Sequence, residues 1–139
     1  MNENQILDDE PIKESLFVRL SECDSKIRIG RIGFFIFFFK SFISFTENLH
    51  VGFLNSLMEN SEVVFIIILI ALSYSTIVFS FIMGILFLVI PQIYLRFNET
   101  LFDISLTNLF FFIGTMHLLV GLYFSIQRLF TERKLLKKS

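Results

Sequence analysis

The sequence contains a single cysteine, Cys23, and no tryptophan among its 139 residues. One thiol excludes an intrachain disulfide and a metal centre built from several cysteines. Charge is also scarce, because charged residues make up 18% of the chain, against roughly a quarter in soluble domains. The net charge of −1 lacks the basic excess that nucleic-acid binding requires. These shortages argue against a disulfide-stabilised domain, a cysteine metal centre and a nucleic-acid-binding protein.

Apolar residues are abundant and gather in long uncharged runs. They make up 54% of the chain, and its mean hydropathy is +0.70. Residues 63–95 and 104–127 carry no charge, and each run exceeds the roughly 20 residues that cross a bilayer. A helix over the whole first run would measure roughly 50 Å, so it must tilt, protrude or break, with Pro91 as a candidate kink. The sequence therefore predicts an all-α membrane protein with confident spans at about 63–92 and 104–127.

Residues 33–58 are apolar but contain the charged side chains Lys40 and Glu47 together with His50. A spacing of seven places Lys40 and Glu47 on nearly the same face of a helix. Charged groups in hydrocarbon face a protein interior or pair with one another. We predict a third transmembrane helix whose polar stripe packs on neighbouring helices. The alternatives are an interfacial helix for the segment, and a proton relay or quinone contact for the polar cluster.

The two ends of the chain are polar. Pro11 and the apolar residues that follow it predict a short amphipathic N-terminal helix, which we expect to lie on a partner subunit or on the membrane surface. Residues 21–33 are typical of a connector. The predicted organisation is a polar segment at 1–32, a helical membrane region at 33–127, and a basic tail at 128–139.

Basic residues are concentrated at the two ends of the chain. Arg96 is the only cation between the two confident spans. Two spans would place both basic ends on one side of the membrane, as the positive-inside rule expects, whereas three spans would divide them about evenly. The basic residues of the two ends are Lys13, Arg19, Lys26, Arg28, Arg31, Arg128, Arg133, Lys134, Lys137 and Lys138.

Two short motifs occur in a suggestive order. Ser56-Leu57-Met58-Glu59-Asn60 precedes the long uncharged run, and the pattern His-x-x-x-Gly at His117 and Gly121 follows an aromatic run. Their order and separation resemble those of the fifth helix and the next helix of cytochrome c oxidase subunit III. The resemblance covers about half of the chain. It departs from the family in the number of helices, and at Leu54 and Asn55, where the family has paired histidines.

This resemblance implies a non-catalytic subunit of a respiratory-chain complex in the mitochondrial inner membrane. Such a subunit packs beside the catalytic oxidase subunit, binds phospholipid and holds no redox cofactor of its own. It is the reason that we favour three spans. The sequence shows no phosphate-binding loop, catalytic triad or metal-ligand spacing, so we expect no catalysis by this chain alone.

His117 and Gly121 also resemble the haem-binding helix of succinate dehydrogenase membrane anchors. That resemblance implies His117 as a haem b ligand, with Gly121 admitting the macrocycle. The simpler interpretation is a polar residue hydrogen-bonded to an adjacent helix, with Gly114 and Gly121 allowing close helix contact. A further alternative is an unassigned accessory membrane subunit.

Overall fold

The computed structural model describes residues 3–97 and 106–138. Within them every regular element is a helix, and three helices are long and apolar enough to cross a membrane, or up to four if a bent pair counts as one. This confirms the predicted helical class. The elements are α1 (Glu3–Glu47), η1 (Leu49–Val51), α2 (Phe53–Glu59), α3 (Ser61–Ser75), α4 (Ile77–Gly84), η2 (Ile85–Val89), α5 (Ile90–Phe97) and α6 (Leu106–Lys138).

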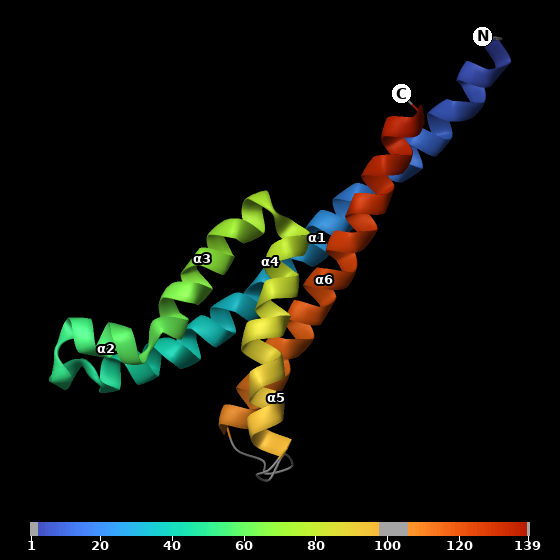
Figure 1. Ribbon diagram of the computed structural model, residues 1–139. Coiled ribbons are helices and arrows are strands. Elements are labelled where there is room, and N and C mark those ends of the chain that lie inside the picture. The colour runs from blue at the N-terminus through green and yellow to red at the C-terminus, as the bar shows by residue number, and fades with distance from the viewer. Residues whose placement is uncertain (1–2, 98–105, 139) are drawn as a thin grey trace.

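Helices α1 and α6 are antiparallel, and they form the long axis of the molecule (Figure 1). Their contacts follow one spacing, since buried or half-buried positions recur alternately three and four residues apart on both helices. This is the heptad spacing of coiled coils. We call this contact the α1–α6 seam. Its α1 positions are Lys13, Leu16, Leu20, Cys23, Ile27, Gly30, Phe34, Phe37 and Ser41. Its α6 positions are Phe111, Gly114, Leu118, Gly121, Ser125, Arg128, Glu132 and Leu135.

Helix α1 corrects the predicted organisation of the N-terminal segment. The structure has one continuous helix of 45 residues where the sequence indicated a short amphipathic helix followed by a connector at 21–33. The residues of that supposed connector contribute to the seam: Cys23 and Ile27 are buried, and Gly30 contacts α6. Packing on α6 therefore continues the helix through a segment that looks irregular by itself.

The uncharged run at 63–92 forms two helices, not the single predicted span. Helix α3 ends at Ser75, the backbone of Thr76 has φ −114° and ψ 74°, and α4 begins at Ile77. The chain then folds back along α3, since the ring of Phe87 in η2, which continues α4, lies 5.4 Å from the ring of Phe65 on α3. The hydroxyl groups of Ser75 and Thr76 both bond to the carbonyl of Leu72. Such local bonds compete with continuation of a helix.

Pro91 does not end the helix that contains it. Helices α4 and α5 are joined by the π-helical turn η2, which ends at Val89, two residues before Pro91. Proline lacks an N–H and its ring crowds the carbonyl four residues earlier. A π-turn widens the backbone at that point, so the chain passes Pro91 without a break.

The predicted span at 33–58 also differs from the structure. Helix α1 ends at Glu47, and the chain then turns through η1 and Gly52, whose φ of +106° suits glycine. Helix α2 returns along the end of α1, where the Ser56 hydroxyl donates to the carbonyl of Phe45 at 2.8 Å. Helices α2 and α3 are bent by 73° relative to each other. The segment is therefore the end of one helix followed by a turn.

Candidate functional site

Four glycines bring the backbones of α1 and α6 into direct contact. A Cβ atom added to Gly30 would lie 2.3 Å from the Cα of Gly121, and one added to Gly33 would lie 2.8 Å from the carbonyl oxygen of Gly114. The helix α4 covers this crossing, because the ring of Phe81 occupies the space beside Gly121. The prediction that Gly114 and Gly121 permit close helix contact is confirmed.

Arg31 of α1 holds the C-terminal end of α3. Its guanidinium donates to the carbonyl of Ser73 at 2.9 Å and lies over the ring of Tyr74, 4.3 Å from the centroid. The carbonyl groups at a helix C-terminus lack partners within the helix and carry partial negative charge. Arg31 therefore ties the end of α3, where the chain turns into α4, to the α1–α6 seam.

A second arginine joins the two long helices at a similar level. The Nε atom of Arg128 on α6 lies 3.0 Å from Oδ1 of Asp24 on α1, and its Nη2 atom lies 3.3 Å from Oε1 of Glu132. All three side chains remain partly exposed. A polar group at a seam position fixes the register of a coiled coil. The pair thus specifies which part of α1 faces which part of α6.

A cavity of about 520 Å³ lies between the α3–α4 turn and α6. Tyr74, Ser75, Thr76, Ile77, Val78, Phe79, Ser125, Arg128, Leu129 and Glu132 line it. Its arginine already faces two carboxylates, those of Asp24 and Glu132. The two carboxylates leave no net positive charge that could bind an anion. The cavity is therefore a polar space beside the ion pairs of Arg128.

The motif around Ser56 and the residue His117 lie far apart in space. Ser56 is buried against Phe45, near the end of α1, whereas the backbone of His117 packs on Gly30. Fifteen residues of α1 separate these two contacts, which is roughly 22 Å of helix. Of the other motif residues, Leu57 is half-buried, while Met58 and Glu59 are exposed. The structure therefore does not bring the two parts of the motif together.

His117 and Gly121 do not offer the space that a haem would need. The Nδ1 atom of His117 is 2.7 Å from the carbonyl oxygen of Ile113, a contact within its own helix and not the predicted one with an adjacent helix. The face beside Gly121 is filled by Gly30 and by the ring of Phe81. A macrocycle approaching along this face would displace both helices, so these residues do not fit the group.

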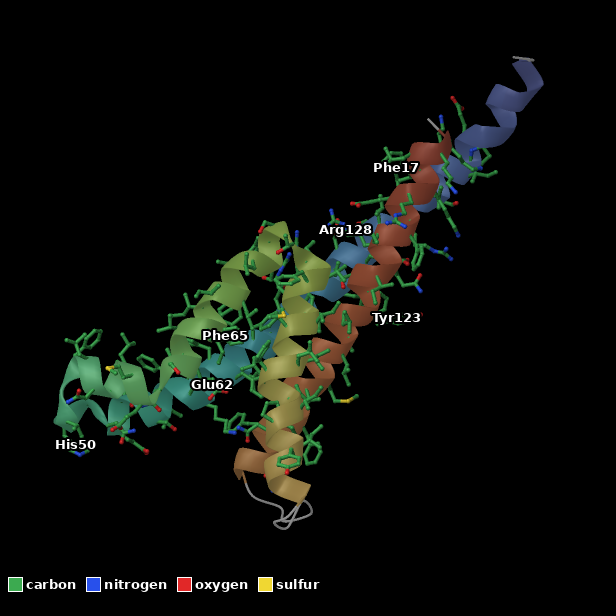
Figure 2. The ribbon with its side chains drawn as sticks, viewed as in Figure 1. Phe17, His50, Glu62, Phe65, Tyr123 and Arg128 are labelled. Atoms are coloured by element: carbon green, nitrogen blue, oxygen red, sulfur yellow. The ribbon has the colours of Figure 1, made fainter. Side chains whose placement is uncertain are left out.

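The residues of the predicted polar cluster lie near the end of α1 or just beyond it. His50 Nδ1 lies 2.9 Å from the backbone carbonyl of Glu47, and both side chains are exposed, whereas Lys40 is half-buried. Figure 2 shows His50 at the opposite end of the molecule from Arg128. Across the described residues, no group of three or more His, Cys, Asp or Glu side chains is placed to hold a metal ion.

The contacts that sequence reasoning missed are the two arginine contacts and the full extent of the seam. The 3–4 spacing of the seam can be read from the sequence once α1 is taken as one helix. The partners of Arg31 cannot be read from the sequence, since the first of them, Ser73, lies 42 positions further along the chain.

Comparison with known protein families, curated proteins and solved structures finds no match to this chain.

Proposed function

We propose that this chain is a multi-pass integral membrane protein that acts as a non-catalytic structural subunit. The observation that carries the proposal is the outward position of its apolar residues. At most 33% of the apolar window in any of the three candidate spans is buried within the protein. Large apolar side chains such as Phe35, Phe39 and Phe87 are half exposed or more. Surfaces of this kind need lipid or another protein to cover them.

The seam extends beyond the apolar part of the molecule and forms a stalk. We define the stalk as residues 10–29 of α1 with residues 125–138 of α6. This part of α1 carries charges throughout, including Glu14, Arg19, Glu22 and Lys26, which hydrocarbon would not accept. Because α1 and α6 continue unbroken from the apolar region, the stalk projects from the membrane instead of lying on it.

The orientation of the stalk follows from its basic residues. The described ends of α1 and α6 lie at the same end of the molecule (Figure 1). Nine of the 12 lysines and arginines belong to the stalk, and the other three are Arg31, Lys40 and Arg96. The positive-inside rule therefore assigns the stalk to the cytoplasmic or matrix side. An even number of crossings, with α2–α3 as one of them, accounts for this placement.

The narrower assignment is a respiratory-chain subunit of the mitochondrial inner membrane, similar to cytochrome c oxidase subunit III and in contact with phospholipid. Its support is the order of the motifs at Ser56 and His117 in the sequence. The family crosses the membrane once between these motifs, whereas this chain folds back at Thr76. The broader proposal of a structural membrane subunit does not depend on this resemblance.

Membrane extraction and purification test both levels. The tagged chain should stay in the membrane pellet at alkaline pH and should purify from mild detergent with other membrane proteins. A chain that is released by alkali, or that is monodisperse in buffer without detergent, contradicts the broader proposal. Recovery of a membrane complex without any copper–haem oxidase subunit contradicts the narrower one.

A further inference from the structure

The stalk carries an apolar groove on one side of the α1–α6 seam. The groove has a volume of about 480 Å³ and is lined by Lys13, Phe17, Glu132, Leu135 and Leu136. Phe17 is 62% exposed and Leu136 is 74% exposed. Figure 2 shows Phe17 where α1 and α6 pair, beyond Arg128. In a segment that projects into water, two such side chains in one groove mark a binding surface.

Nearer the membrane, a helix of this chain covers the same side of the seam. Phe17 and Arg31 are two heptads apart on α1, so they share a face. At Arg31 that face meets the end of α3, and the ring of Phe81 on α4 sits beside Gly121. This cover ends at the α3–α4 turn, on the membrane side of Glu132. Glu132 lines both the cavity at the turn and the groove. The part of this face nearer the membrane is thus covered by a helix.

The charges along the two edges of the groove differ in sign. On α1, Glu10 and Glu14 precede Phe17 by seven and three residues, so they lie beside it on the helix surface. With Lys13 they give this edge a net negative charge. On α6, Arg133 and Lys137 are exposed, and Glu132 is balanced by Arg128. This second edge has a net positive charge.

We propose that the groove binds an amphipathic helix of another protein, which completes a three-helix bundle around the stalk. The apolar stripe of that helix covers Phe17, Leu135 and Leu136. Its acidic edge lies along Arg133 and Lys137, and its basic edge lies along Glu10 and Glu14. Recognition of this type places an amphipathic helix in an apolar groove.

A second copy of this chain fits the groove less well than a separate helix. The groove and the α3–α4 hairpin are on the same side of the seam, as the contacts of Arg31 and Phe81 show. Two copies facing each other through this side would bring their hairpins together first. The hairpins would hold the two grooves apart.

Three synthetic amphipathic peptides of about six helical turns test the proposal. All carry the same leucine stripe; one has glutamate on one edge and lysine on the other, one has glutamate on both edges, and one has lysine on both. Binding to the full chain in nanodiscs of neutral lipid is measured by fluorescence anisotropy, with empty nanodiscs as the blank. The mixed peptide can bind in either direction along the groove, so one of its two orientations places glutamate beside the positive edge and lysine beside the negative edge.

We expect the mixed peptide to bind most tightly and the all-lysine peptide to bind about tenfold more weakly, since like charges then face Arg133 and Lys137. Phe17→Ser should abolish the difference between peptides, whereas Val18→Ser, at an exposed position on the next face of α1, should preserve it. Equal binding of all three peptides, or binding unchanged by Phe17→Ser, overturns the proposal.

A photo-cross-linking amino acid at position 17 in native membranes distinguishes the occupants. A product that combines this chain with a different polypeptide, cross-linked through a helical segment of mixed charge, supports the proposal. A product with twice the mass of the chain shows that a second copy fills the groove, and it overturns the proposal. Neither outcome depends on whether the spans are two or four.

Discussion

The two halves of the α1–α6 seam share one spacing but use different side chains. In the apolar half, Gly30 and Gly121 bring the backbones into contact. In the stalk, none of the seam positions is glycine; they include leucines such as Leu16 and Leu135, and an ion pair joins Asp24 and Arg128. In lipid the hydrophobic effect does not drive helices together, and their association depends on the close packing that small residues allow. In water, apolar burial is the main driving force. In the proposed membrane placement, the choice of residues follows the change of solvent along the seam, while the heptad spacing is the same in both halves.

The largest effect is expected at the glycine crossing. Replacing Gly121 with leucine forces a side chain into the space occupied by Gly30 and the ring of Phe81, which should lower the free energy of unfolding by about 3 kcal/mol or more. Unfolding in mixed micelles with increasing denaturing detergent measures the change. Leu119→Ala, on an exposed face of the same helix, is the control. Equal midpoints for the two variants would refute the close contact.

A smaller loss should follow the removal of Arg31. Arg31→Ala leaves the Ser73 carbonyl without its charged donor and removes the stacking on Tyr74, at a cost of about 2 kcal/mol. The same unfolding assay measures it, and modification of a cysteine placed at the buried position of Ser73 reports local opening. Arg28→Ala removes an exposed arginine three residues earlier and should have little effect. Similar losses for both variants would mean that Arg31 contributes only its charge.

The ion pair of the stalk should contribute less. Asp24 and Arg128 are 49% and 31% exposed in their side chains, so solvent screens the attraction. Asp24→Asn should cost about 0.5–1 kcal/mol, with a difference from the parent that shrinks as salt is added. Glu22→Gln, an exposed neighbour, serves as the control. A loss that does not depend on salt would point to packing instead of charge.

Pro91 should give the smallest change, with the opposite sign. Pro91→Ala restores a backbone N–H and removes the ring, so the π-turn at Ile85–Val89 should revert to regular α-helix. The restored hydrogen bond contributes about 1 kcal/mol, and the greater freedom of the unfolded chain without the proline offsets about half of it, so we expect a net gain of only about 0.5 kcal/mol. Hydrogen exchange of residues 85–91 should slow in the variant. Unchanged exchange would show that packing, not Pro91, imposes the π-turn.

Local sequence patterns predicted the helical class and the close contact at Gly114 and Gly121. These features depend on composition and on spacing within one helix. The fold-back at Thr76 was not predicted, because the surrounding residues carry neither proline nor glycine, and a short polar stretch such as residues 73–76 also occurs inside continuous membrane helices, where hydroxyl groups bond back to their own helix. The hydroxyl groups of Ser75 and Thr76, together with the donor from Arg31 far away in the sequence, hold the end of α3.

The continuous helix α1 was missed for a related reason. Its residues 21–33 mix charged and polar side chains with two glycines, a composition typical of a connector. Those glycines lie on α6, and Cys23 and Ile27 complete the buried stripe. Tertiary contact with α6 thus decides a local structure that propensity alone assigns differently. The heptad positions on both helices carried the signal, but only as a pair.

Disulfide cross-linking across the seam tests the central claim most directly. Gly30 faces Gly121, so Ile27 and Ser125, one step along each antiparallel helix, should face each other. Ile27→Cys with Ser125→Cys, in a Cys23→Ser background, should form an intrachain disulfide in native membranes under mild oxidation. Ile29→Cys with Ser125→Cys, which starts from an exposed position on α1, should not. Equal cross-linking of the two pairs, or none in the first, would contradict a single seam running from the membrane into the stalk.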